Sequence, residues 1–80
     1  MRPEVVREFL HAAPFRPIRI TLTDGRTYDV HHPEMAMVGR SEVIIGLPRR
    51  GLDEVVFDRF VTVSLLHIMQ IEPLESATAT

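Results

Sequence analysis

The chain has 80 residues and no cysteine, so neither a disulfide nor a thiolate metal site can support its fold. With 45% hydrophobic and 25% charged residues, it has the composition of a globular domain, which argues against a disordered segment. The net charge of −2 lacks the basic excess that dedicated nucleic-acid-binding proteins usually carry. A domain this short buries only a small core, so we expect it to gain stability by association with other chains.

The sequence predicts one domain over residues 1–74 and a disordered tail over residues 75–80, which are mostly small and polar. No apolar run approaches the roughly 20 residues that a membrane-spanning helix needs. The first residues also lack the basic-then-apolar layout of a secretory signal. We therefore expect no membrane association and a cytoplasmic location.

The first predicted element is a helix at residues 3–13. Pro3 suits the first helical turn, where its missing amide hydrogen costs nothing. Pro14 and Pro17 end the helix. An apolar stripe at helical spacing would cover the open end of a sheet, and it consists of Val5, Val6, Phe9, Leu10 and Ala13.

A β-hairpin follows, with predicted strands at residues 16–23 and 26–31. Apolar residues alternate with polar ones on both sides of Asp24-Gly25, with Ile18, Ile20 and Leu22 before it and Tyr28 and Val30 after it. The alternation indicates that one face is buried, and Asp-Gly favours a tight two-residue turn with positive φ angles.

Three further strands are predicted at residues 42–47, 54–63 and 68–72. Val43 and Ile45 share a face, and Ile44 is apolar on the opposite face, which favours a strand covered on both sides. Residues 64–67 fit a single 3₁₀ turn opened by Ser64. Before these strands, Met35 and Met37 are expected to pack on an irregular edge or to form an adaptable apolar contact patch.

This order predicts a mainly β fold, a five-stranded SH3-like barrel with an N-terminal helix, because closure removes exposed strand edges. The added helix is typical of the Sm-like variant. The chain resembles the Sm family, in particular its bacterial host-factor RNA chaperones, over about residues 5–73. The likeness consists of the helix, the hairpin PIRITLTDGRTYDV, the strand VIIGL and a last strand that ends at Pro73. We expect nearer relatives among small bacterial proteins of the same pattern.

The resemblance implies a ring whose fourth and fifth strands pair between subunits, and it implies binding of single-stranded RNA. Two features depart from the family. Where its members have a Tyr-Lys-His run entering the last turn, this chain has Phe57-Asp58-Arg59-Phe60, which includes a carboxylate and no lysine. Residues 31–41 are also longer and more irregular than the family's bend. The resemblance therefore implies the fold and not the pore residues.

No catalytic, metal-binding or cofactor-binding arrangement is apparent, so we expect a protein that is not an enzyme. His31 and His32 are adjacent, so on a strand their side chains would point to opposite faces. Ser41 and Ser64 lie outside any Gly-x-Ser-x-Gly elbow. His67 is expected to form structural hydrogen bonds. A barrel of this size also leaves little room for a pocket of roughly 300 Å³ or more.

Two groups of residues are candidate contacts. Candidates for contact with RNA or a partner are Arg26, Arg40, Arg49, Arg50 and Phe60. The arginines could hold phosphates or carboxylates, or could be solvated turn residues balanced by nearby acidic residues such as Asp24. Phe60 could stack on a base or contact another subunit. Candidates for a subunit interface are Val55, Phe57, Val61, Val63, Met69 and Ile71.

The function we expect is that of a non-catalytic β-barrel module acting through self-association, as a homo-oligomer, or through binding of another protein. Binding of single-stranded RNA is the alternative. A third interpretation is a small ligand-binding or regulatory domain that acts beside an enzyme.

Overall fold

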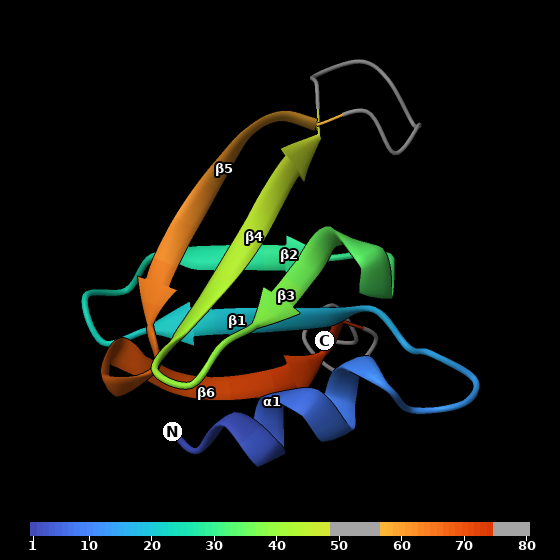
Figure 1. Ribbon diagram of the computed structural model, residues 1–80, viewed down its shortest axis with the longest axis horizontal. Coiled ribbons are helices and arrows are strands. Elements are labelled where there is room, and N and C mark those ends of the chain that lie inside the picture. The colour runs from blue at the N-terminus through green and yellow to red at the C-terminus, as the bar shows by residue number, and fades with distance from the viewer. Residues whose placement is uncertain (49–56, 75–80) are drawn as a thin grey trace.

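The computed structural model describes residues 1–48 and 57–74. Over these residues the chain is mainly β, with one N-terminal helix and two three-stranded antiparallel sheets in the orders β2-β1-β6 and β3-β4-β5 (Figure 1). The elements in chain order are α1 (Pro3–Leu10), β1 (Ile18–Leu22), β2 (Thr27–Val30), the 3₁₀ turn η1 (Pro33–Met35), β3 (Ala36–Val38), β4 (Glu42–Pro48), β5 (Phe57–Ser64), the 3₁₀ turn η2 (Leu65–His67) and β6 (Ile68–Pro73).

The prediction of five strands missed one, because the segment after Pro33 contains β3. This strand pairs with β4, with Ala36 opposite Ile45 and Val38 opposite Val43. Pro33 has no amide hydrogen to give to a ladder, so the chain turns through η1 between β2 and β3. Among the described residues, the ladders form two sheets and do not close into a barrel.

The predicted hairpin is present, but its turn is longer than two residues. Leu22 N donates to Arg26 O (2.8 Å) and Gly25 N donates to Leu22 O (2.9 Å), which leaves a loop of three residues. Gly25 has a φ of 93°, and within the described chain no residue other than glycine has a positive φ. The predicted two-residue turn, with positive φ at both residues, is therefore wrong, because the φ of Asp24 is not positive and only Gly25 adopts the left-handed conformation.

Apolar side chains from both sheets and from α1 form one core. The alternation in β1 is confirmed, since Ile18, Ile20 and Leu22 are all buried. The remaining buried residues are Val6, Leu10, Val30, Met35, Ala36, Val43, Ile45, Val63, Leu65 and Ile68. Ile44, on the opposite face of β4, is half-buried. The core therefore lies between the two sheets, and α1 contributes Val6 and Leu10 to it, which are about one helical turn apart.

The helix ends three residues earlier than predicted, at Leu10. His11 N donates to Arg7 O (2.9 Å), which completes the last turn. Ala13 precedes Pro14, and a residue before proline is driven away from helical geometry. Ala13 is consequently exposed and outside the helix, while Val6 and Leu10 carry the stripe into the core. In the described part of the chain, no helix has the length and apolar character to cross a membrane.

The 3₁₀ turn predicted at residues 64–67 is confirmed as η2. The Ser64 hydroxyl oxygen accepts from Leu66 N (3.2 Å), so Ser64 opens the turn. Thr23 N donates to His67 O (2.8 Å), and the N-terminal amine of Met1 donates to Leu65 O (2.9 Å). The first bond fixes η2 against the β1–β2 loop, which brings the end of β5 close to that loop, and the second joins η2 to the N-terminus.

The predicted strand over residues 54–63 is described only from Phe57, as β5. The expected tail over residues 75–80 lies outside the described residues, as do residues 49–56.

Candidate functional site

Strand β5 has an open edge, because within the described residues it pairs only with β4. Leu65 N donates to Ser41 O (2.9 Å), so the main-chain groups of Leu65 face β4. Main-chain groups alternate between the two sides of a strand. The amides of Val61 and Val63 therefore face β4, whereas those of Thr62 and Ser64 face the open edge.

Strand β6 has an open edge of the same kind, since it pairs only with β1 within the described chain. Leu74 N donates to Pro17 O (2.9 Å), and Ile20 lies opposite Ile71. By the same alternation, the main-chain groups of Ile71 face away from β1. The two strands that flank η2 thus both present unpaired main-chain groups.

Exposed apolar side chains gather on the same part of the chain. Of the four large hydrophobic residues that are exposed in the described structure, Phe60 lies on β5, Leu66 on η2 and Met69 on β6, and the fourth, Met37, lies on β3. Leu66 is 85% exposed. Single exposed apolar residues are ordinary, but three on the segment that carries two open edges are typical of an interaction surface.

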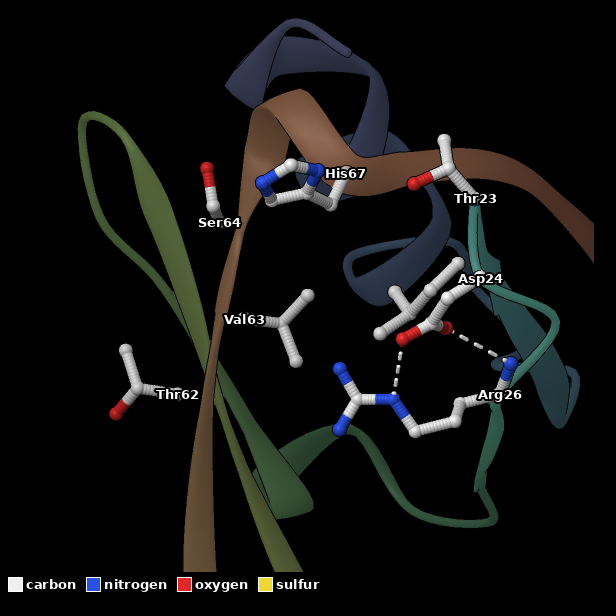
Figure 2. A pocket seen from close by; sticks show the side chains of 8 residues that line it. Thr23, Asp24, Arg26, Thr62, Val63, Ser64 and His67 are labelled. Atoms are coloured by element: carbon white, nitrogen blue, oxygen red, sulfur yellow. Dashed lines mark hydrogen bonds and ion pairs between the residues drawn. The ribbon is translucent and has the colours of Figure 1, made fainter.

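A hollow of about 440 Å³ lies beside β5, between the β1–β2 loop and η2 (Figure 2). The loop contributes Thr23, Asp24 and Arg26, and the opposite wall consists of Thr62, Val63 and Ser64 of β5. His67 of η2 lies at one end (Figure 2). The buried side chains of Leu22 and Val63 supply an apolar floor, so the hollow combines apolar and polar surface.

Arg26 is held in place by Asp24. Arg26 Nε donates to Asp24 Oδ2 (2.8 Å), and Arg26 N donates to Asp24 Oδ1 (3.0 Å). The main-chain hydrogen bond, together with the guanidinium, holds the pKa of the Asp24 carboxyl below its usual value. In Figure 2 the two terminal nitrogens of Arg26 lie on the side away from the Arg26–Asp24 contact, toward β5.

A second hollow of about 480 Å³ lies between α1, η1 and β3. Leu10 and Ala36 are buried beneath it, and Met37 is exposed beside it. Exposed Arg7, His11 and Glu34 surround it with mixed charge. Among the described residues, no ion pair holds a charged side chain of its lining in place as Asp24 holds Arg26, so the hollow beside β5 is the better candidate.

The structure separates the residues predicted to contact RNA or a partner. Arg26 lies in the β1–β2 loop and Arg40 in the β3–β4 turn, and both are exposed. Phe60 points outward from β5, where it is 61% exposed. The prediction that Asp24 balances Arg26 is confirmed. Arg49 and Arg50 lie outside the described residues.

The predicted interface residues fall into two groups. Met69 is exposed, and Val61 and Ile71 are half-buried. Val63 is 5% exposed and packs in the core. Val55 lies outside the described residues, and of Phe57 only the place at the start of β5 is described.

The stretch Phe57-Asp58-Arg59-Phe60 forms the first half of β5. Strand β5 continues to Ser64, so Val63 and Ser64 enter η2. Sequence reasoning missed Thr23, Thr62 and His67 as neighbours of Arg26, since no spacing in the sequence joins them.

Within residues 1–48 and 57–74, no three His, Asp or Glu side chains form a group that could hold a metal ion. His31 and His32 are both exposed, in the bend that precedes η1. Comparison with known protein families, with functionally characterised proteins and with solved structures finds no match to this chain.

Proposed function

We propose that this protein is a non-catalytic module of SH3-like, Sm-like architecture that acts by self-association. In this proposal, the open edge of β5 on one copy pairs with the open edge of β6 on the next. The observation that carries it is the outward direction of the Thr62 and Ser64 main-chain groups beside exposed Phe60 and Leu66. The element order and the likeness to the Sm family support the same pairing.

The sequence of β5 supports this use of its edge. Monomeric proteins usually protect an edge strand with a charge, a proline or a bulge. Residues 60–64, FVTVS, contain no charge and no proline, whereas the charged residues of the strand, Asp58 and Arg59, and the β4–β5 register shift next to Pro48 lie in its first half. An edge of this kind is a template for main-chain hydrogen bonds with another strand.

The pairing is heterologous, because each copy uses β5 toward one neighbour and β6 toward the other. Contacts of this type repeat around a ring when the rotation closes, and otherwise extend as a filament. A ring pairs the edges of β5 and β6 in every copy and covers exposed apolar residues of β5, η2 and β6, while β2 and β3 stay edge strands. For a domain of 9.1 kDa, this additional burial offsets its small core.

Sedimentation velocity at micromolar concentration tests the proposal with two variants at one position. Thr62→Pro removes the amide that faces the open edge, while the amides that face β4 remain. Thr62→Ala removes the same exposed side chain and keeps that amide. We expect the wild type and Thr62→Ala to sediment well above 9.1 kDa, and Thr62→Pro to sediment as a monomer.

Circular dichroism of Thr62→Pro should match that of the wild type, since Thr62 is exposed and lies on an edge strand. A wild type that stays monomeric at every concentration contradicts self-association. A Thr62→Pro variant as large as the wild type contradicts the use of the β5 edge.

Single-stranded RNA binding remains the alternative, and exposed Phe60 and Arg26 are the described residues that favour it. The net charge of −2 argues against it. Titration with oligo(U) and oligo(A) at low salt decides between the two. RNA binding predicts an affinity whose logarithm falls linearly with the logarithm of the salt concentration. Flat titrations eliminate it.

A further inference from the structure

The hollow between the β1–β2 loop and β5 contains a positioned arginine with spare donors. Asp24 accepts from the main-chain amide and from Nε of Arg26, so one edge of the guanidinium is occupied. Within the described residues, the terminal nitrogens Nη1 and Nη2 have no partner, and Figure 2 shows them on the side toward β5. An arginine stays charged at any physiological pH, and its two terminal nitrogens match the spacing of two oxygens on one acid group.

Further polar groups surround the same space. Thr23 and His67 lie along the rim opposite Arg26 in Figure 2, joined by the hydrogen bond from Thr23 N to His67 O (2.8 Å). That bond leaves the Thr23 hydroxyl and the His67 ring available for a ligand. Together with Arg26, they place several donors around one cavity.

The occupancy of Asp24 favours an anion over a cation. Both carboxylate oxygens already accept from Arg26, at 3.0 Å and 2.8 Å. A cation at these oxygens would lie beside the positive guanidinium, which repels it, whereas an anion uses donors of Arg26 that Asp24 leaves open. Holding the guanidinium in advance also lowers the entropy lost when a ligand binds.

We infer that this hollow binds a small acid, a phosphate or a carboxylate attached to a short apolar group, with the acid on Arg26. The volume of about 440 Å³ lies within the range of small-molecule pockets. Leu22 and Val63, which are 2% and 5% exposed, form a floor on which an apolar group can pack. The site uses side chains of one copy, and two of its lining residues, Thr62 and Ser64, also lie on the β5 edge that the proposed function pairs with another copy.

The test is a titration followed by ¹H–¹⁵N correlation spectra, with inorganic phosphate, acetate and hexanoate as probes and sodium chloride at matched ionic strength as the blank. We expect saturable shifts at residues 22–26 and 62–67. Hexanoate should bind more tightly than acetate, because its chain reaches the floor. Binding of phosphate alone identifies a phosphate ester as the ligand class, and binding of the carboxylates alone identifies an organic acid.

Variants at two arginines make the test specific. Arg26→Gln should weaken binding by about tenfold or more, because it removes a charged two-pronged donor. Arg26→Lys should weaken it less, since it keeps the charge without the fork. Arg40→Gln is the matched control, an exposed turn arginine that does not line the hollow, and should bind as the wild type does.

Three results overturn the inference. One is the absence of saturable shifts with any probe. Another is equal binding by wild type and Arg26→Gln in proteins whose spectra show the same fold. The third is a loss of binding in Arg40→Gln as large as that in Arg26→Gln. Equal affinities for acetate and hexanoate overturn the role of the apolar floor.

Discussion

Three residues of the β1–β2 loop determine much of the candidate site. Gly25 supplies the left-handed conformation that closes the loop, with a φ of 93°. Asp24 then accepts from the main chain and the side chain of Arg26, which directs the guanidinium over the hollow. The loop therefore positions a charge as well as reversing the chain.

The Asp24 carboxylate makes the contribution of this loop to the stability of the fold depend on pH. Its pKa is lowered in the folded protein, chiefly by the hydrogen bond from Arg26 N. Its contribution to stability is therefore complete above the carboxyl pKa of the unfolded chain, and it is lost as pH falls through the lowered pKa of the folded protein. Asparagine does not titrate, so Asp24→Asn lacks this contribution at every pH.

We expect the wild type to be more stable than Asp24→Asn near neutral pH, with the difference shrinking toward acid pH. Urea denaturation of both proteins along a pH series measures it. Asp29→Asn, which removes the Arg19–Asp29 pair (2.8 Å) without touching the loop, is the control for the general effect of losing a carboxylate. If the difference in unfolding free energy between the wild type and Asp24→Asn stays constant from neutral to acid pH, this would falsify the assignment of the pH-dependent contribution to Asp24.

At the scale of elements, the sequence predicted features set by neighbouring residues better than it predicted pairing between distant strands. The β1 alternation, the Asp-Gly loop and the Ser64 cap of η2 each lie within a few neighbouring residues, so the sequence predicts them. Strand β3 is only three residues long, and its conformation depends on pairing with β4. Such pairing has no marker within the segment itself, and the predicted strand count was accordingly one short.

The candidate site was predictable only in part for the same reason. Arg26 and its balance by Asp24 follow from their separation of two residues in a turn. Thr62 and His67 join them only through the fold, when η2 bonds to Thr23. The direction of the Thr62 amide likewise depends on the β4–β5 register, which the sequence does not specify.

Helix α1 is an element whose role can be measured directly. Leu10 is 5% exposed and packs in the core, so Leu10→Ala removes buried methyl groups and leaves a cavity. We expect a loss of about 2–4 kcal/mol in the free energy of unfolding, measured by urea denaturation. Glu8→Ala on the exposed face should change it by less than about 0.5 kcal/mol. Equal effects of the two substitutions would show that the helix does not cover the core.

On the scale of the whole molecule, two of the four edge strands, β5 and β6, and three of the four exposed large apolar residues lie on one continuous segment of the described chain, from β5 through η2 to β6. A core formed by a few residues from each sheet leaves a domain of this length with modest stability. The proposed pairing between copies would remove the open edges of β5 and β6 and cover Phe60, Leu66 and Met69. Assembly would thus complete a fold that one copy leaves open.

Amide hydrogen exchange at Thr62, followed at several protein concentrations, tests this central claim most directly. The account predicts fast exchange at Thr62 in dilute solution and marked protection at high concentration, while Val63, whose amide faces β4, stays protected throughout. Fast exchange at Thr62 at every concentration, with Val63 protected, would contradict it, because the β5 edge would then never pair with a second copy.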